Sequence, residues 1–516
     1  MPLLNSKRTL MLALLATGMA GIVAEYILAT LATYFLGDSV FQWTIILSLM
    51  LFSMGLGSRI SRWIKSNLEA WFVGIEFTLS ILTSLSSLFV YLLMPHLSNL
   101  APSIYLLAIV IGALIGMEIP LVTRINAKNA ELRTNISEVM EKDYFGSLLG
   151  GLFFAFVGIK YLGITYTPFI VGGVNLIVAV LVFFKFKKYI LQGLLNKLSV
   201  FGGVVVIAIL GGLYFSEPIV LYGNQNLYTG KVVFSEQTPY QKITITKWQK
   251  DYWLYLNSGK QLSTFDEWMY HEPLVHPAVQ LAGKPKHVLL MGAGDGCAIR
   301  ELLKYPFIDS ITLVDLDPRM IEIGQTQPIL RKVNQDAYQS SKVNVVVGDA
   351  FNYLEKTPKV YDVIIADFPD PRSVDLSRLY SKEMYNLVYH RLSHNGVFIT
   401  QAASPYYTTK AFRCIEKTMQ AANFNVLPLH NHIYTFGEWG WMMGTKKLPA
   451  SFMKEKIEAM TWETIPTKFL TPSASQMITN FGGDLVEVDS NDLKINSIYN
   501  PVLYRYYGEG NWSYYF

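Results

Sequence analysis

Apolar residues follow two different patterns along this chain, and the change falls near residue 217. Up to that point, long apolar runs are separated by short connections, and a bilayer span needs about 20 mostly apolar residues. Seven runs qualify, at residues 10–36, 41–58, 71–94, 103–122, 145–163, 168–184 and 199–215. We therefore predict that residues 1–217 form an N-terminal α-helical transmembrane bundle of about seven spans in a lipid bilayer.

Beyond residue 217 the apolar runs become short. Within residues 218–283, the stretch KVVFSEQTPYQKITITKW alternates apolar and polar positions, which predicts a small antiparallel β subdomain, followed by a linking helix. Residues 284–450 alternate apolar runs with helical stretches, so we expect a Rossmann-like α/β catalytic domain of the methyltransferase type with a parallel sheet. Residues 451–516 form a C-terminal extension dense in aromatic side chains, which rests either on the membrane domain or on the enzyme core.

Basic residues mark one side of the apolar half. They follow the second, fourth and sixth apolar runs, at Arg59, Arg62, Lys65, Arg124, Lys128, Arg133, Lys142, Lys185, Lys187, Lys188 and Lys197. The opposite loops around Asp38 and residues 96–103 carry no Lys or Arg. Because cytoplasmic loops are enriched in these residues, we predict a cytoplasmic N-terminus.

Four acidic residues lie within or beside the apolar runs: Glu25, Glu76, Glu118 and Asp143. Carboxylates in lipid are costly and often functional. They either attract a polycationic substrate or fix helix packing by pairing with a basic or hydroxyl side chain. A third reading places them at the level of the lipid headgroups.

The overall composition argues against two classes of function. The net charge of +4 at pH 7 is too small and too evenly spread for nucleic-acid binding. The two cysteines, Cys297 and Cys414, have no metal-ligand spacing and cannot form a disulfide framework. His271 and His276 are one residue too far apart for the zinc motif H-E-x-x-H, so we expect no metal site.

Carboxylates stand at the ends of the predicted strands of the α/β domain. They are Asp295, Asp315, Asp349, Asp367 and Asp370. Ligands of such sheets bind at the carboxyl ends of the strands, so these acids should line one pocket. The glycine turn GAGDG at 292–296 is not followed by Lys-Ser/Thr, which argues against a phosphate loop. An acid in this turn repels phosphate and favours an ammonium, so we expect a nucleoside with a positively charged tail.

Eight short motifs give the second half a family resemblance. They are TPYQKI (238–243), DEWMYHEPLVH (266–276), GAGDG (292–296), VDLD (314–317), VVGDA (346–350), DFPDP (367–371), LYSKEMY (379–385) and FGEWGW (436–441). Together they resemble the spermidine synthase family, the polyamine aminopropyltransferases, over roughly residues 220–450. The first half resembles the multi-span membrane domain fused to some bacterial members.

The resemblance implies that the donor is decarboxylated S-adenosylmethionine, a substrate, and that no cofactor is tightly bound. In this reading Asp295 pairs with the ammonium of the donor, Asp315 with its ribose and Asp349 with its adenine. The donor-site residues implied are Gln241, Gly292, Gly294, Asp295, Asp315 and Asp349.

Asp367 matches the catalytic base of the family. A polyamine acceptor such as putrescine is a diammonium, and one amine must lose a proton before it can attack the donor. Asp370 would bind the same amine. The acceptor-side residues implied are Tyr270, His271, Asp370, Gln401 and Tyr434.

Departures from the family pattern put the acceptor in doubt. Phe368-Pro369 separates the two aspartates where soluble members have a small hydroxyl residue, and Tyr434-Thr435-Phe436-Gly437 replaces the usual Tyr-Pro-Ser-Gly. Two other functions stay open. One is an S-adenosylmethionine-dependent amine methyltransferase, and the other is a polyamine transporter or sensor whose second half only binds ligand.

Two arguments oppose each other on the side of the cell membrane at which residues 218–516 lie. Seven spans from a cytoplasmic start place them outside, whereas a cytosolic substrate requires them inside. We take the cytoplasmic side as the expectation. The resemblance also allows a homo-oligomer.

Overall fold

The computed structural model describes residues 6–37, 39–97, 99–127, 131–482, 488 and 492–511. Asp38, Lys128 and the last part of the aromatic tail, residues 512–516, lie outside the described residues. The chain divides into two compact units, residues 1–232 and 233–516. The finer division into four parts stays a prediction.

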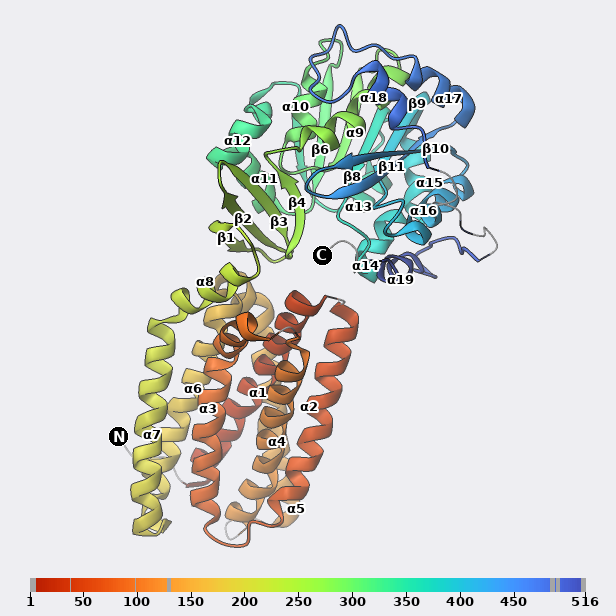
Figure 1. Ribbon diagram of the computed structural model, residues 1–516. Coiled ribbons are helices and arrows are strands. Elements are labelled where there is room, and N and C mark those ends of the chain that lie inside the picture. Colours follow the sequence, from red (N-terminus) through yellow and green to blue (C-terminus); the bar gives the residue numbers. More distant parts are fainter. Residues whose placement is uncertain are drawn as a thin grey trace. The chain divides into compact units, whose positions relative to one another are not determined.

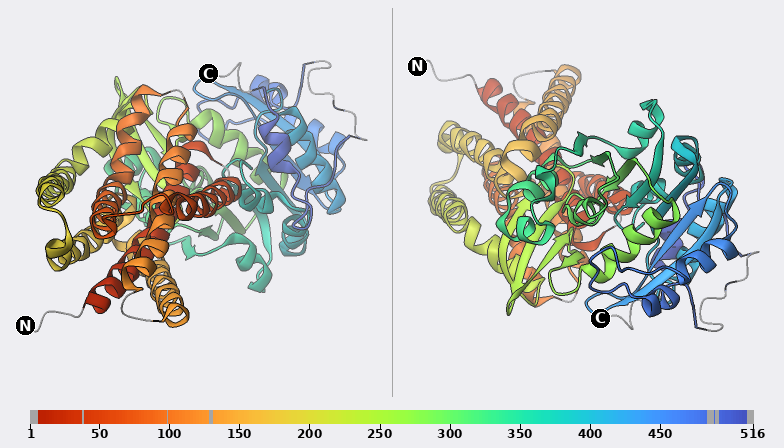
Figure 2. Two further views of the ribbon diagram at one scale, coloured as in Figure 1. Left: turned by 90° about the horizontal axis from the view of Figure 1, so that it is seen from below. Right: turned by 90° about the horizontal axis from the view of Figure 1, so that it is seen from above.

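The first unit is a bundle of helices that run up and down beside one another (Figures 1 and 2). The long helices are α1 (Ser6–Leu36), α2 (Ser39–Ser61), α3 (Leu68–Leu93), α4 (Ala101–Asn126), α5 (Leu132–Phe153), α6 (Gly163–Phe186) and α7 (Gln192–Tyr214), and the short helix α8 (Ser216–Asn226) follows α7. A π-helical segment, Phe154–Leu162, joins α5 to α6, and one-turn 3-10 helices follow α3 and α6 at Met94–His96 and Lys187–Tyr189.

Six helical runs of the described residues are long and apolar enough to cross a membrane, so the predicted count of seven is not confirmed. The difference lies in one run, residues 132–189, which contains both predicted spans 145–163 and 168–184. This run is interrupted at Gly163, whose φ of 66° lies in the left-handed region that favours glycine.

Small residues bring the helices of the first unit into close contact. A Cβ atom at Gly57 of α2 would lie 1.9 Å from the carbonyl oxygen of Ala113 in α4. At Gly146 of α5, it would lie 2.2 Å from the carbonyl oxygen of Leu15 in α1. Such close backbone packing is typical of membrane helices, whose association has no hydrophobic drive in lipid.

The second unit contains two sheets. The antiparallel sheet has the order β1-β2-β3-β4, with β1 (Lys231–Gln237), β2 (Lys242–Trp248), β3 (Asp251–Leu256) and β4 (Gly259–Ser263). The larger sheet has the order β10-β11-β9-β8-β5-β6-β7. Its strands are β5 (His287–Gly292), β6 (Ser310–Asp315), β7 (Val343–Val347), β8 (Tyr361–Asp367), β9 (Leu392–Gln401), β10 (Asn425–Ile433) and β11 (Gly437–Thr445).

The larger sheet is mixed rather than wholly parallel, which corrects the sequence-based expectation. Strand β11 pairs antiparallel with both β9 and β10. A tight connection at residues 434–436 lets β11 fold back on β10, and only antiparallel neighbours can be joined by so short a link. Gly437, with a φ of 76°, ends this turn.

Helices cover both faces of the larger sheet (Figure 1). They are α9 (Trp268–Leu281), α10 (Cys297–Leu303), α11 (Pro318–Thr326), α12 (Pro328–Asn334), α13 (Ala350–Lys356), α14 (Val374–Ser377), α15 (Lys382–Arg391), α16 (Thr409–Ala421), α17 (Ala450–Glu458), α18 (Pro472–Met477) and α19 (Leu503–Gly508), with single 3-10 turns at Ala337–Gln339 and Arg378–Tyr380. Successive residues of β5 face opposite layers: Leu290 joins the core under α9 and α10, and Leu289 joins the core under α15 and α16.

The described part of the C-terminal extension packs on the enzyme core. Met453, Trp462 and Leu470 join the hydrophobic cluster on one face of the sheet. Leu503 and Tyr507 of α19 join the cluster on the other face. Of the two sequence-based alternatives, the structure therefore favours packing against the core for these residues.

Candidate active site

A cavity of about 510 Å³ opens at the carboxyl ends of β5, β6 and β8, beside the antiparallel sheet. Eleven of the twelve predicted site residues line it: Gln241, Tyr270, His271, Gly292, Gly294, Asp295, Asp315, Asp349, Asp367, Asp370 and Gln401. The five strand-end acids therefore meet at one place, as the topology of the sheet predicts.

Tyr434 is the predicted site residue that does not line this cavity. It lies in the turn between β10 and β11, is 64% exposed, and contacts the rings of Phe265 and His432. Phe436 and Trp439, from the same hairpin, line the cavity instead. The sequence of this turn predicted an aromatic residue at the site. The fold of the hairpin places Phe436 and Trp439 at the cavity, whereas Tyr434 lies outside it.

The glycine turn after β5 is shaped by close backbone contacts. Gly292 has a φ of 77°, and a Cβ atom there would lie 2.2 Å from the carbonyl oxygen of Asp367. A Cβ atom at Gly294 would lie 2.8 Å from Oδ2 of Asp315. Both glycines are therefore required for the ends of β5, β6 and β8 to approach each other. The residue between them, Ala293, adopts a φ of 62°.

Several strand-end acids also accept backbone hydrogen bonds. Oδ1 of Asp295 accepts from the amide of Cys297 at 2.7 Å, and Oδ1 of Asp349 accepts from the amide of Asn352 at 2.8 Å. Each bond uses one oxygen to hold the start of a helix. A carboxylate has two oxygens, so helix capping and ligand binding do not exclude each other.

Asp367 at the end of β8 is held by Tyr270. The Tyr270 hydroxyl donates a hydrogen bond of 2.5 Å to Oδ1 of Asp367. Burial raises the pKa of Asp367 to about 6; the charge of Asp295 adds to this rise, and His271 and the Tyr270 hydrogen bond oppose it. Burial and the nearby carboxylates hold the pKa of Tyr270 well above its ordinary value, so the phenol stays protonated and acts as the donor.

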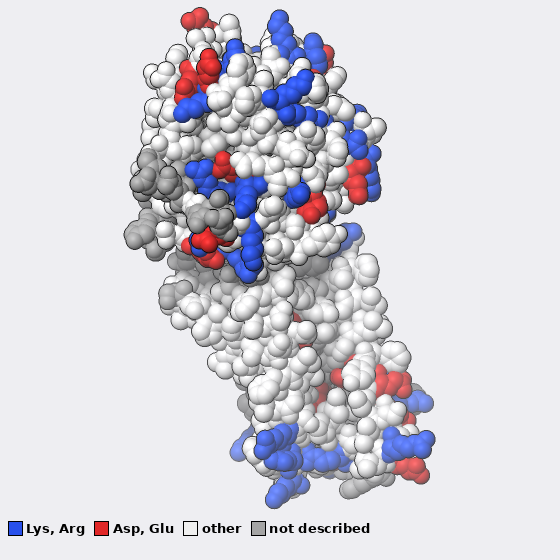
Figure 3. Space-filling view, turned by 90° about the vertical axis from the view of Figure 1, so that its right-hand side faces the viewer, with Lys and Arg blue, Asp and Glu red and all other residues white. Residues whose placement is uncertain are grey.

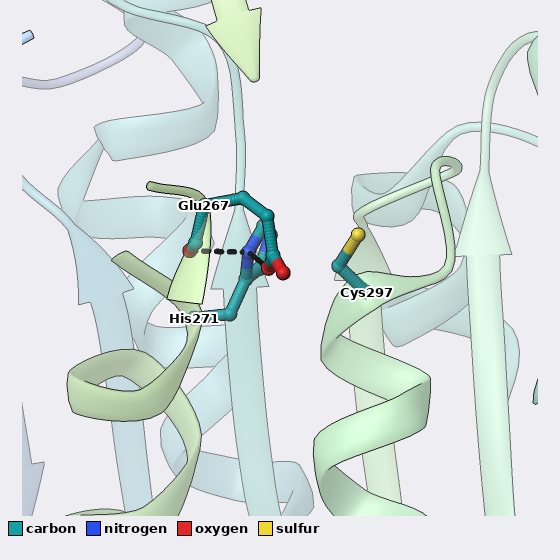
Figure 4. A group of neighbouring side chains, drawn as sticks. All are labelled: Glu267, His271 and Cys297. Atoms are coloured by element: carbon teal, nitrogen blue, oxygen red, sulfur yellow. Dashed lines mark hydrogen bonds and ion pairs between the residues drawn. The ribbon is translucent and has the colours of Figure 1, made fainter. Parts of the chain in front are cut away.

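His271 of α9 is part of a buried chain of charges (Figure 4). Its Nδ1 lies 2.9 Å from the carbonyl oxygen and 3.0 Å from Oε2 of Glu267, and both partners are acceptors, so Nδ1 carries a proton. Its Nε2 lies 4.0 Å from Oδ1 of Asp295. Burial opposes protonation, but the hydrogen bond to Glu267 and the charges of Asp295, Glu267 and Asp367 raise the pKa of His271 to about 9.

Arg300 completes this chain on the far side of Glu267. Its Nη1 and Nη2 donate to the two Glu267 oxygens, each at 2.9 Å. Glu267 thus joins two cations, which orients the imidazole of His271 towards Asp295. Glu267 and Arg300 were not predicted as site residues, and they reach the cavity only through His271.

Two groups of side chains have donor atoms close enough to hold a metal ion: Glu267, His271 and Cys297, and His271, Asp295 and Asp367. In the first group His271 bonds to Glu267 (Figure 4). Both oxygens of Glu267 also accept hydrogen bonds from Arg300. His271 belongs to both groups, and its Nδ1 already bonds to the carbonyl oxygen and Oε2 of Glu267. We therefore interpret both groups as an ion-pair network.

His276 points into a different network from His271. It contacts the Tyr305 hydroxyl at 2.8 Å and Oε2 of Glu301 at 2.7 Å, and it is fully buried. The two histidines of DEWMYHEPLVH thus face different partners, as their five-residue spacing on a helix implies.

Three polar side chains lie within hydrogen-bonding distance of the Asp370 carboxylate. The hydroxyl of Tyr507 donates to its Oδ2 at 2.8 Å, Nη2 of Arg372 lies 3.2 Å from the same oxygen, and Nε2 of Gln401 lies 3.4 Å from Oδ1. Gln401 also bonds to the carbonyl of Phe368 at 2.9 Å and to the hydroxyl of Tyr380. Neither Arg372 nor Tyr507 was predicted as a site residue.

The opposite end of the cavity carries Asp315 and Asp349. Burial and the neighbouring Asp317 and Asp295 raise the pKa of Asp315 to about 6, while backbone hydrogen bonds oppose the rise. Asp349 lies 3.6 Å from the guanidinium of Arg378. Gln241 lines the same end, and its amide nitrogen donates to Oδ2 of Asp317 at 3.0 Å. Two of the five acids, Asp349 and Asp370, thus have arginine neighbours.

Comparisons with known proteins point to one group of enzymes. The model of the spermine/spermidine synthase domain matches residues 267–455. Polyamine aminopropyltransferase 2 of Aquifex aeolicus (strain VF5) is 41% identical over 96% of this chain and 98% of its own length. The polyamine aminopropyltransferase of Oceanobacillus iheyensis is 36% identical over 96% of both chains.

Among solved structures, a spermidine synthase in complex with the transition state analogue AdoDATO is similar to part of this chain. It is 24% identical, with a TM-score of 0.43, and the match covers 49% of this chain and 84% of that one.

Proposed function

This chain belongs to the polyamine aminopropyltransferase family, which confirms the sequence resemblance, and we propose that it transfers an aminopropyl group from decarboxylated S-adenosylmethionine to putrescine or a related amine. The products would be spermidine, or a related polyamine, and methylthioadenosine. The proposal rests on one observation. Asp295 and Asp367 line the same cavity, and the hydroxyl of Tyr270 donates a hydrogen bond to Asp367.

The charges around the glycine turn suit a cationic donor. The ion-pair network joins the cations Arg300, Lys304 and protonated His271 to the carboxylates of Glu267, Glu301, Asp295 and Asp367. Three cations face four carboxylates, which leaves one negative charge uncompensated. A donor that ends in an ammonium supplies the missing charge. The carboxylate of intact S-adenosylmethionine would instead be repelled by Asp295. Asp315, Asp349 and Gln241 would bind the nucleoside part.

In the proposed reaction, the nitrogen of the acceptor attacks the carbon next to the sulfonium. The new C–N bond forms as the C–S bond breaks, and the electron pair of that bond stays on sulfur, which leaves as a neutral thioether. The proton of the attacking ammonium passes to the carboxylate of Asp367. Asp370 and Gln401 would orient the acceptor, with the two substrates held against carboxylates in one cavity.

We also propose that the first unit crosses the cell membrane. Its helical runs are long and apolar enough, and lysines and arginines gather at one end of the unit while its side is largely free of charge (Figure 3). Arg124 donates to the carbonyl oxygens of Ser61 and Ile64, so the basic ends of α2 and α4 meet. A homo-oligomer stays a prediction.

Product analysis by mass spectrometry tests the proposed reaction. The purified full chain is incubated with either decarboxylated or intact S-adenosylmethionine and a panel of diamines. We expect aminopropylated product only with the decarboxylated donor. A methylated amine formed from the intact donor would instead support the methyltransferase alternative, and ligand binding without turnover would support the sensor.

A further inference from the structure

Five helices place polar side chains at one level inside the first unit. They are Thr17 of α1, Glu76 of α3, Glu118 of α4, Asp143 of α5 and Asn175 of α6. All are buried, with exposures between 0% and 7%. Each lies eight to eleven residues from the end of its helix at the basic side, which is roughly 12–17 Å at 1.5 Å per residue. Asp143 directly follows the exposed ion pair of Lys142 and Glu141, so this level lies towards the basic side of the first unit.

Hydrogen bonds connect these residues into one cluster. The Thr17 hydroxyl lies 3.2 Å from Oε1 of Glu76 and 3.4 Å from Oδ1 of Asn175. Nδ2 of Asn175 donates to the carbonyl oxygen of Glu76 at 3.3 Å. The carboxyl group of Glu118 reaches the same threonine, and it lies close enough to Glu76 and Asp143 for their charges to interact.

One oxygen in this cluster lacks a partner. Oε1 of Glu118 is buried and has no hydrogen-bond partner, and the whole residue is 1% exposed. Within the described residues of the first unit, the ion pairs are Lys7 with Glu138 and Lys142 with Glu141, so no basic side chain pairs with Glu76 or Glu118. Neighbouring buried carboxylates without a cation are strongly destabilising.

We propose that Glu76 and Glu118 bind a small monovalent cation, H⁺ or Na⁺, with the oxygens of Thr17 and Asn175 as neutral neighbours. The inference rests on the proposed membrane insertion and extends it to a cation site that the transferase reaction does not use. Its residues are hard oxygen donors from separate helices, which suit a proton or an alkali ion.

Close helix packing argues against a polyamine at this level. A Cβ atom at Gly18 would lie 2.3 Å from the carbonyl oxygen of Asp143, and one at Gly172 would lie 2.1 Å from Oγ of Ser84. At these contacts α1 lies against α5, and α6 lies against α3, with little space between the helices. A single ion or proton needs less space than a polyamine.

The test uses the full-length protein in lipid nanodiscs. Radioactive Na⁺ binding is measured near neutral pH, and infrared spectroscopy follows the carbonyl stretch of protonated carboxylic acids. Saturable Na⁺ binding that Glu118→Gln weakens roughly tenfold or more would support an alkali-ion site. A protonated-carboxyl band that disappears in Glu118→Gln, without Na⁺ binding, would support a proton site.

Glu141→Gln is the matched control, because this carboxylate is 49% exposed on α5 and pairs with Lys142; it should change neither signal. Glu118→Asp, which keeps the carboxylate, should retain part of the signal, and Thr17→Val gives a second variant if Glu118→Gln does not fold. Aminopropyl transfer by the same preparations reports folding of the second unit.

Wild-type protein with neither Na⁺ binding nor a protonated-carboxyl band would overturn the proposal. So would spermidine binding that Glu118→Gln abolishes, because it would make this a polyamine site. A failure of aminopropyl transfer would contradict the proposed reaction but not the cation site, because neither Na⁺ binding nor the infrared band depends on turnover. Release of the protein from membranes by alkaline carbonate would instead contradict membrane insertion.

Discussion

The hydroxyl of Tyr507 donates a hydrogen bond of 2.8 Å to Oδ2 of Asp370, although 137 residues separate them. Tyr507 comes from α19 in the C-terminal extension and is 5% exposed. Burial and the charge of Asp370 raise the pKa of Tyr507 well above its ordinary value, so the phenol remains a donor. The extension therefore holds in place Asp370, one of the acids that line the cavity.

Removing this hydroxyl should affect the acceptor more than the donor. We expect Tyr507→Phe to raise the KM for the amine roughly tenfold, because hydrogen bonds to charged groups contribute about 1.5–3 kcal/mol. Donor affinity, measured by calorimetry, should not change. Tyr504→Phe, on the same helix, is the control. An unchanged KM for the amine in Tyr507→Phe would mean that Asp370 does not contact the acceptor.

Replacing the proposed base should stop transfer while leaving the donor site intact. Asp367→Asn removes the proton acceptor, and general base catalysis typically contributes roughly 10²–10⁴-fold to the rate. We expect a loss of turnover in this range, with donor binding retained. Asp309→Asn changes a carboxylate that is 57% exposed and serves as the control. Normal turnover in Asp367→Asn would show that another group takes the proton.

The bond between Tyr270 and Asp367 predicts a shift in the pH profile. Asp367 must be ionised to accept a proton, so kcat/KM should fall as the pH drops through its pKa of about 6. The tyrosine hydrogen bond stabilises the carboxylate, and its loss in Tyr270→Phe should raise this pKa. The acidic limb should therefore move to higher pH. If the acidic limb of kcat/KM lies at the same pH in Tyr270→Phe as in the wild type, a group other than Asp367 determines it.

His271 predicts a dependence of stability on pH. Its pKa is raised from 6.5 to about 9 in the folded protein, so protonation stabilises the fold. This contribution is fully present below about pH 6.5 and is lost as the pH rises through about 9. We expect the Tm of the second unit, measured in the full chain, to fall over this interval and the fall to be smaller in His271→Asn. A parallel fall in both proteins would contradict the assignment.

The course of α7 predicts the side of the membrane on which the catalytic unit lies. This helix begins next to Lys185, Lys187 and Lys188 and ends at Tyr214, so the chain leaves the first unit opposite its basic end. If the basic end is cytoplasmic, protease added outside intact spheroplasts should cleave the second unit. Protection of the second unit from protease would support its expected cytoplasmic location. The basic end of the first unit would then face outward, contrary to the rule that Lys and Arg are enriched in cytoplasmic loops.

Local patterns in the sequence were sufficient to predict the helical character of the first unit, the α/β alternation of the second and the acids at its strand ends. The apolar period and the turn residues act within a few positions, so they can be read without tertiary contacts. The convergence of Asp295, Asp315, Asp349, Asp367 and Asp370 followed from one rule of sheet topology. The motifs were specific enough to identify the family.

Only the tertiary structure decided which distant side chains meet. Arg300 reaches Glu267, Tyr507 reaches Asp370, and Tyr434 lies outside the cavity while Trp439 lines it. In the first unit, packing of five helices brings Glu76 and Glu118 together although each is a single acid within its own apolar run. Such contacts depend on how helices and strands pack against one another, so no local pattern in the sequence predicts them.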